Sequence, residues 1–548
     1  MDVLVGRFDT SYTDNISTLK YRRNQFATVN RLPNEILSRI FLLCVDEFER
    51  HWYSEWYVWQ YLRLTSVCRR WRNLAIDVVQ LWTLIDLNCR EDLIQMHLSR
   101  SKNAKLTVVH SRLKPFLEIG VDVEISLFKE LLAPQLHRIV ALQLRVSPRL
   151  WAEVHPSLQL PAPSLRHLSL TRCHDCALPD EGPESEVLNS QNLFLGQAQL
   201  ETLDLRYRTQ WSSLLPLVGS LRALRLSVGR DSHGALQELI TALHFIPTLE
   251  YLELQLHDHV YQLNPPYISA THSLPVVTLP HLAELVIHST NDAYILDYLI
   301  TPRLRQCFIK ISLLPHPARF LIPLTRCFSF AEVQDMRVVP VAYGPQFCFT
   351  EPNTEPARPY ADMSQGADFV STPFRLHPGI QLVIAWLAPS DPGMEFMYTS
   401  LMGRAGKLRR LVLQGNIGRR HLFHILKLHV QVLRRASNIR DLVIESHRDI
   451  LDILELLEDT NVCPQLTTFS CVGCASDRKS FGKQLVAFAR ARRRSNTLTH
   501  IRMSNCPPVA NMWIVQLNRL GVELTETDVG QPVCQMMSLL YFVTDGEV

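Results

Sequence analysis

The segment LRHLSL (Leu165–Leu170) sets a pattern, L-x-x-L-x-L, that returns along the chain. The clearest later copies begin at Leu200, Leu221, Leu249 and Leu282, at spacings of 35, 21, 28 and 33 residues. The alternating L-x-L positions predict a short strand with one apolar side, and the intervening residues leave room for a helix and a loop. The pattern therefore predicts stacked strands that share one core.

Further copies lie downstream. Weaker ones are Leu304/Cys307/Ile309 and Val333/Met336/Val338, and after a gap the pattern resumes at Leu408/Leu411/Leu413, Ile439/Leu442/Ile444, Leu466/Phe469/Cys471 and Leu498/Ile501/Met503. Val108, Ile139, Leu142 and Leu144 are expected in the first, irregular strands. Residues 235–243 and 422–433 are amphipathic and are expected to form helices that return over the other side.

This pattern resembles the leucine-rich repeat proteins over roughly residues 105–530. The resemblance implies an α/β solenoid, with parallel strands on the concave face and helices and loops on the convex face. One segment breaks the period: residues 340–373 hold six prolines in 34 residues, which predicts a protruding loop. Another apolar strand is expected beyond it, at Ile380, Leu382 and Ile384.

A different pattern lies upstream, in LPNEILSRIFLLCV (residues 32–45). Pro33 suits the first turn of a helix because its missing N–H needs no partner there, and Glu35 suits the positive helix end. Apolar residues then recur at helical spacing, which predicts one apolar stripe: Ile36, Leu37, Ile40, Phe41 and Cys44. A second helical stripe runs through YLRLTSVCRRWRNLA (residues 61–75), with Arg69, Arg70 and Arg72 opposite it, and Leu81 and Trp82 follow.

These residues resemble the F-box family, in particular the many F-box-like proteins of fungi. The shared features are the LP-x-E-I opening, the apolar helix, the V-C-x-x-W helix and the closing L-W. The resemblance covers about residues 29–90, and the aromatic-rich insertion DEFERHWYSEWYVWQ (residues 46–60) departs from the family's usual spacing. Residues 1–28 are expected to be a flexible N-terminus and 531–548 a C-terminal tail.

The F-box resemblance implies docking on a Skp-type adaptor, which bridges to a cullin–RING ubiquitin ligase. The residues that match the family's motif would engage the adaptor: Leu32, Pro33, Ile36, Ile40, Val67, Cys68 and Trp71. The chain would then be the substrate-recognition subunit of an SCF-type ligase, a non-catalytic receptor whose repeats bind a protein client. Two alternatives stay open: a repeat scaffold without ligase association, and a helical cap in which the LP and VCRRW pieces are coincidental.

Alternation places the residues between the leucines on the concave side, where a client would bind. Candidate client-binding residues are Arg206, Arg225, Glu253, Arg409 and Arg410. Such charges are usually solvated surface, but arginines can also hold an acidic or phosphorylated segment through charge-assisted hydrogen bonds.

Composition narrows the classes of function. The 548 residues carry 56 Lys and Arg against 53 Asp and Glu, a net charge of +3 that is too small for a dedicated nucleic-acid binder. The longest apolar run (residues 382–389) is too short to span a membrane, and the first ten residues do not resemble a signal peptide. A cytoplasmic or nuclear protein with 13 reduced cysteines is therefore expected.

Neither a cofactor nor a metal is expected. The chain lacks GxxxxGK[ST], GxGxxG, GxSxG and HExxH motifs, and so gives no starting point for an enzyme site. The pairs Cys173/Cys176 and Cys471/Cys474 have the C-x-x-C spacing of a zinc or redox site, but Cys173, Cys474 and Cys506 each follow a repeat strand where the repeat consensus has Asn or Cys. Histidines at 257 and 259 and at 421, 424 and 429 are expected on the surface.

Overall fold

The computed structural model gives a chain that divides into two units. One is built mainly from residues up to Leu254, and the other mainly from Gln255 onward. The structure describes residues 18–20, 22–24, 26–49, 57–110, 125–172, 187–188, 193–205, 208–209, 214–228, 232–256, 275–289, 294–311, 324, 326–327, 335–341, 344–350, 381–386, 408–414, 430, 432–434, 436–445, 450–473, 478–493, 497–506 and 508–527.

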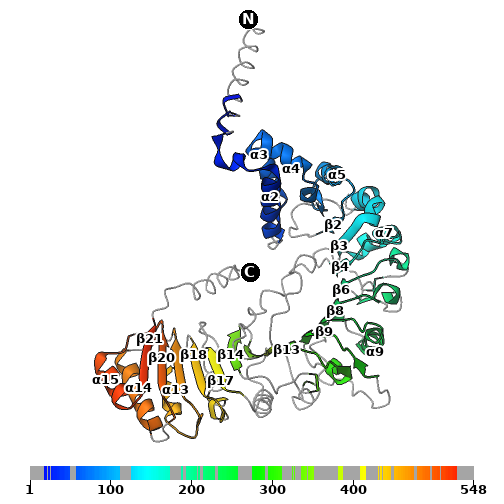
Figure 1. Cartoon of the computed structure of the whole chain (residues 1–548). Coiled ribbons are helices and arrows are strands. Elements are labelled where there is room, and N and C mark those ends of the chain that lie inside the picture. The colour runs from blue at the N-terminus through cyan, green and yellow to red at the C-terminus, as the bar shows by residue number, and fades with distance from the viewer. Residues whose placement is uncertain are drawn as a thin grey trace, which may run out of the picture. The chain divides into compact units, whose positions relative to one another are not determined.

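The first unit begins with a helical region (Figure 1). It consists of η1 (Thr28–Arg31), α2 (Asn34–Glu49), α3 (Tyr57–Val67), α4 (Arg69–Asp77) and η2 (Val79–Trp82). The stripe predicted over residues 61–75 is therefore two helices. The break falls at Cys68, whose backbone is extended (φ −158°, ψ 169°) and whose thiol accepts a hydrogen bond from the backbone N–H of Trp71 at 3.5 Å. Cys68 thus acts as the N-cap of α4.

Strands and helices alternate after the helical region. The order is β1 (Leu84–Asp86), α5 (Glu91–Arg100), β2 (Leu106–Val109), η3 (Phe128–Leu132), η4 (Ala133–Arg138), β3 (Ile139–Val146), α7 (Pro148–Leu158), β4 (His167–Arg172), η7 (Leu193–Gly196), β6 (Thr202–Leu205), η8 (Leu215–Leu217), β8 (Ala223–Val228), α9 (Ser232–Leu243) and β9 (Tyr251–Leu256), with β5 (Val187–Leu188) and β7 (Arg208–Thr209) pairing apart. From β1 to β8 the main strands pair in parallel, each with the next. Helices α5, α7 and α9 lie on one side of them (Figure 1).

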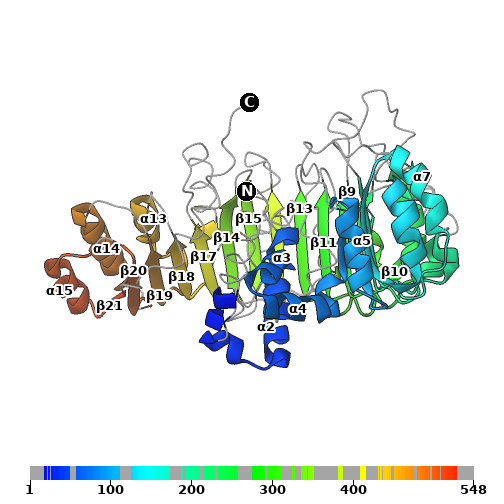
Figure 2. The same cartoon turned by 90° about the horizontal axis from the view of Figure 1, so that it is seen from above.

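In its described residues, the second unit consists of strands β10 to β21 with three helices and one 3-10 helix between them. Its elements are β10 (Val277–Thr278), β11 (Glu284–Ser289), η9 (Tyr294–Tyr298), β12 (Leu299–Ile300), β13 (Gln306–Ile311), β14 (Asp335–Val341), β15 (Gly344–Thr350), β16 (Gln381–Trp386), β17 (Arg410–Gln414), β18 (Asp441–Glu445), α13 (Ile450–Leu457), β19 (Thr468–Val472), α14 (Arg478–Arg493), β20 (His500–Ser504), α15 (Asn511–Arg519) and β21 (Glu523–Thr527). Strands β17 to β21 pair in parallel and lie side by side in Figure 2.

The expected Pro-rich loop requires a correction. Residues 335–341 and 344–350 form a hairpin, β14 and β15, and β15 is antiparallel to both β14 and β16. The two prolines, Pro340 and Pro345, lie opposite each other beside the turn, so they affect the pairing only at the end of the hairpin. Residues 351–380, the rest of the predicted loop, lie outside the described part of the chain.

The core confirms the prediction made from the leucine pattern. All fifteen residues of the five clearest L-x-x-L-x-L copies are at most 5% exposed. Just after β20, the Cys506 thiol donates to the Cys471 carbonyl of the neighbouring strand β19 at 3.5 Å. An α/β architecture of parallel strands after a helical N-terminal region is thus confirmed. In the portion of the chain that is described, no helix is both long and apolar enough to cross a bilayer.

Candidate functional site

Helix α2 carries apolar side chains on two faces. Leu37 and Phe41, one turn apart, are fully buried. Ile36 and Leu43 are 50% and 53% exposed, and Ile40, which lies between them at helical spacing, is partly buried. The predicted single stripe is therefore two: an inner face that holds the fold together and an outer face of isoleucine and leucine that is open to solvent.

The inner face packs on a small core. Leu37, Phe41, Ala75, Leu81 and Trp82 form it, and Trp71 packs against it with its ring 5.0 Å from that of Phe41. The Trp82 indole N–H donates to the Ala75 carbonyl at 2.9 Å, so its polar atom is satisfied in a buried position.

Arg70 fixes the turn that leads into α2. Its guanidinium donates to the Asn30 carbonyl, to the Leu32 carbonyl at 2.6 Å and to Oδ1 of Asn34 at 2.7 Å. Sequence reasoning placed Arg70 on the solvent side of its helix. These contacts instead bring the start of α4, and with it the end of α3 at Val67, to the same end of the region as the first turn of α2.

Two motif residues hold this region together from inside. Trp71 donates from its indole N–H to Oδ1 of Asn30 at 2.8 Å, and Cys68 caps α4. Both side chains are partly buried. Their place in the motif is thus explained by local structure, whether or not they also touch a partner.

The other motif residues are open to solvent or nearly so. Pro33, Ile36 and Val67 are exposed, Val67 at 55%, while Leu32 and Ile40 are partly buried. Leu43 belongs to the same face but was not predicted as a site residue; its position seven residues after Ile36 is the signal that could have revealed it.

His97 joins the helical region to the first strands. Its Nδ1 lies 2.9 Å from the Leu84 carbonyl, and its ring packs against Trp82 with centroids 5.2 Å apart. Burial lowers the pKa of His97 to about 4, the Leu84 carbonyl opposes this shift, and nearby Arg100 adds to it. His97 is therefore neutral at physiological pH.

The predicted client-binding residues fall into two groups. Arg225 and Glu253 form an ion pair at 2.8 Å, with side chains 11% and 19% exposed, and the Arg225 guanidinium also lies over the Tyr251 ring. Burial alone would lower the pKa of Arg225, but Tyr251, Glu253 and Asp204 raise it. Arg225 is thus a charge committed to its own strands rather than an open contact, because its register places it beside acidic neighbours.

Arg409 and Arg410, in contrast, are exposed at the start of β17. Arg206 lies outside the described residues, as do Cys173, Cys176, Cys474 and the histidines at 257, 259, 421, 424 and 429. Among the described residues, no three His, Cys, Asp or Glu side chains are grouped so that they could hold a metal ion.

Comparison with known proteins bears on the helical region. Residues 29–88 match the F-box-like family. The match spans η1 to β1 and includes both faces of α2, the Arg70 contacts and the Trp82 core. No curated protein matches the chain. Residues 29–88 therefore form an F-box-like domain.

Proposed function

We propose that this chain is the substrate-recognition subunit of an SCF-type ubiquitin ligase. Its F-box-like domain would bind a Skp-type adaptor, and its strand region, which we propose is a leucine-rich repeat array, would bind a protein client. The observation that carries the first half is the exposed apolar face of α2. F-box proteins are typically non-catalytic receptors, so ubiquitin transfer would rest on the other subunits and on the proximity of the client.

The distribution of exposed apolar side chains supports an interface in this domain. Of the thirteen large apolar residues that are exposed in the described part of the chain, four lie in the F-box-like domain: Val29, Ile36, Leu43 and Val67. Ile36 and Leu43, seven residues apart, lie on one face of α2, and exposed apolar side chains that share a face are typical of interaction sites.

Burial of this face would contribute to the free energy of adaptor binding. Fully burying an aliphatic side chain is worth about 1.5–3 kcal/mol. Ile36, Leu43 and Val67 are each about half exposed and would gain part of this on docking. We therefore propose Ile36, Ile40, Leu43 and Val67, flanked by Leu32 and Pro33, as the adaptor contact. Cys68 and Trp71 would act mainly by holding the α3–α4 junction in place.

Support for the repeat array is the combination of sequence spacing and parallel pairing. Copies of L-x-x-L-x-L coincide with strands that pair in parallel, and their leucines are buried. Stacked repeats of this kind present long surfaces to protein partners.

The test is co-elution of the full-length chain with a purified Skp-type adaptor in size-exclusion chromatography. Wild type is compared with an Ile36→Asp/Val67→Lys variant, in which Asp lies near a helix N-terminus and Lys at a helix C-terminus, so both suit the helix dipole. A Met512→Asp/Val515→Asp variant is the matched control, because these residues are 59% and 48% exposed on α15, outside the domain.

Wild type and the α15 variant are expected to bind the adaptor, and the α2/α3 variant to lose at least about 100-fold in affinity. Loss in both variants would point to a different interface. Wild type that does not bind would favour the alternative of an interaction scaffold without ligase association.

A further inference from the structure

We infer that Arg409 and Arg440, on neighbouring strands of the second unit, bind carboxylates of an acidic segment of a protein client. This rests on the proposed role of the strand region in client binding. The argument comes from a row of backbone positions that recurs in both units, one residue before each strand.

These positions are equivalent because they make the same backbone hydrogen bond. In the first unit the N–H of Glu201 donates to the Arg166 carbonyl at 2.7 Å, that of Arg222 to Glu201 at 2.8 Å, and that of Glu250 to Arg222 at 2.7 Å. In the second unit the N–H of Arg440 donates to the Arg409 carbonyl at 2.8 Å, and that of Thr467 to Arg440 at 2.8 Å. The side chains at these positions are therefore stacked, about 4.8 Å apart from strand to strand.

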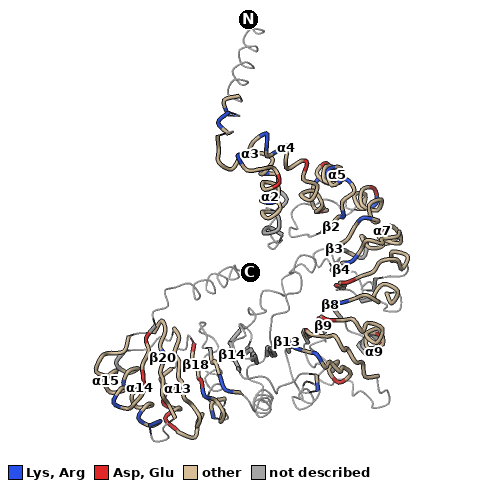
Figure 3. Tube along the Cα trace, in the orientation of Figure 1, with Lys and Arg blue, Asp and Glu red and all other residues tan. Residues whose placement is uncertain are grey.

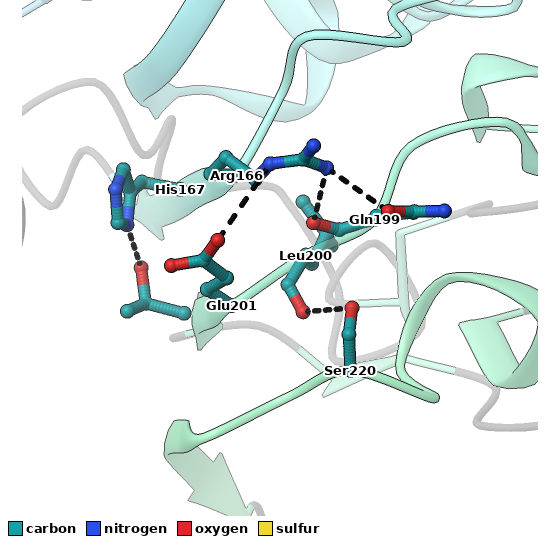
Figure 4. A network of polar contacts seen from close by, with 7 residues as sticks. Arg166, His167, Gln199, Leu200, Glu201 and Ser220 are labelled. Atoms are coloured by element: carbon teal, nitrogen blue, oxygen red, sulfur yellow. Dashed lines mark hydrogen bonds and ion pairs between the residues drawn. The ribbon is translucent and has the colours of Figure 1, made fainter.

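In the first unit the charges in this row alternate. Nε of Arg166 lies 3.6 Å from Oε1 of Glu201. Nη2 of Arg222 donates to both carboxylate oxygens of Glu250, at 2.7 and 2.9 Å. Figure 4 shows Arg166 between Glu201 and Gln199, whose carbonyl it also binds at 3.1 Å. Each arginine of the row has its own carboxylate.

In the second unit the alternation is replaced by two arginines in succession. Arg409 and Arg440 are both exposed, and within the described part of the chain neither forms an ion pair. Basic residues colour the trace blue beside β18 in Figure 3. Like charges at adjacent positions on neighbouring strands repel each other, and an anion bound between them would remove this repulsion.

The residues around Arg409 and Arg440 include one acid and two threonines, but the net charge of the group favours an anion. Arg410 is also exposed and lies opposite Asp441 in the β17–β18 register. The next positions of the row, Thr467 and Thr499, carry hydroxyls that donate to the carbonyls of Arg440 and Thr467 at 3.1 and 3.2 Å. With Arg410 facing Asp441, Arg409 and Arg440 remain as the positive charge of this group.

The first unit indicates which anion suits this row. There the arginines are satisfied by glutamates, through single or paired N–H···O contacts. A planar guanidinium matches a carboxylate in this way, and the contact is charge-assisted. A client segment with successive acidic side chains would restore, between molecules, the pairing that the first unit makes within itself.

The experiment measures binding of the full-length chain to a fluorescein-labelled peptide of alternating Glu and Ala, by fluorescence anisotropy at low salt. The same peptide with Gln for Glu, and one with phosphoserine for Glu, are the comparison ligands. The decisive variant is Arg440→Glu, which restores the alternating pattern. Arg222→Gln, which removes an arginine that already has its partner, is the matched control.

The expected result is binding of the Glu peptide by wild type and by Arg222→Gln, and a loss of about tenfold or more in Arg440→Glu. The same Arg440→Glu variant should melt slightly higher, by about 1 °C, because repulsion is replaced by attraction. Equal binding by Arg440→Glu and wild type, equal binding of the Gln peptide, or a preference for the phosphoserine peptide would each overturn the carboxylate assignment.

Adaptor binding measured on the same samples separates this inference from the proposed function. Arg440→Glu should bind the adaptor as wild type does. Peptide binding without adaptor binding would leave the carboxylate site standing and remove the ligase role, and the reverse would remove only the carboxylate site.

Discussion

The F-box-like domain and the strand region differ in how far their apolar side chains are buried. In α2 the inner residues Leu37 and Phe41 are fully buried, while Ile36 and Leu43 on the outer face stay half exposed. In the strands the leucines are buried, and the residues between them, such as Arg225 and Glu253, pair with one another. The leucines of these strands are used up by the core, whereas the domain keeps half-exposed apolar side chains on its first helix.

This difference separates two meanings of an apolar residue in a sequence. On a strand, successive side chains point to opposite sides of the sheet, so alternating leucines are predicted to lie in the core. On a short helix that is apolar over more than half of its circumference, only part of the surface can be covered by a domain of about 60 residues. The apolar surface that stays uncovered is the surface on which the proposed interface rests.

The largest expected effect contrasts the two faces of α2. Phe41→Ala should lower the free energy of unfolding of the domain by about 3–5 kcal/mol, because it removes a fully buried ring beside Trp71. Ile36→Ala should change it by less than about 0.5 kcal/mol. Urea denaturation followed by tryptophan fluorescence measures both. Equal losses in the two variants would show that α2 has no outward face.

The second effect concerns the joint between the two regions. Burial of His97 lowers its pKa to about 4, so below pH 6.5 the unfolded chain takes up a proton that the folded chain does not. The free energy of unfolding should therefore fall by up to about 3 kcal/mol as the pH drops from about 6.5 to about 4. Below pH 4 His97 is protonated in both states and contributes no further loss.

His97→Asn keeps a donor for the Leu84 carbonyl but does not titrate. Thermal unfolding at a series of pH values should show a flatter profile for this variant than for wild type between pH 4 and 6.5. Identical profiles would mean that His97 is not the group responsible.

A smaller effect is expected at Arg70. Arg70→Gln removes charge-assisted hydrogen bonds to the turn before α2 and should cost about 1–2 kcal/mol. It should also weaken adaptor binding, since this turn sets where Pro33 and Ile36 lie. The matched control is Arg69→Gln, an exposed neighbour on the same helix. The interpretation fails if both substitutions have the same effect on adaptor affinity.

The smallest effect belongs to the self-paired strands. A double-mutant cycle with Arg222→Gln and Glu250→Gln should give a coupling of about 0.5 kcal/mol, because the side chains are 58% and 37% exposed. The coupling should decrease in 1 M salt, where charges are screened. A repulsive coupling would contradict the alternating row of charges in the first unit.

Much of the strand region could be predicted from sequence because its signal is local. The L-x-x-L-x-L leucines lie in the core as expected, and the strand expected near Leu382 and Ile384 is β16. The burial of Arg225 could not be predicted, because it depends on the register with strands some thirty residues away. The strand expected at Met336 and Val338 is β14, whereas β15 was missed because the prolines suggested a loop.

In the F-box-like domain the motif identified the right segment but not the role of each residue. Cys68 breaks what looked like one helix, Trp71 and Arg70 hold the turn, and Leu43 adds to the outer face. A stripe of apolar residues at helical spacing does not by itself tell which of two adjacent faces meets the core, because that choice depends on where the neighbouring helices pack.

The most direct test of the central claim is amide hydrogen exchange of the full-length chain with and without a Skp-type adaptor. The account predicts that the adaptor slows exchange in the first three turns of α2 and at the end of α3 near Val67, and leaves β17 and β18 unchanged. A complex that forms without slowing exchange in α2, or that protects the strands instead, would contradict it.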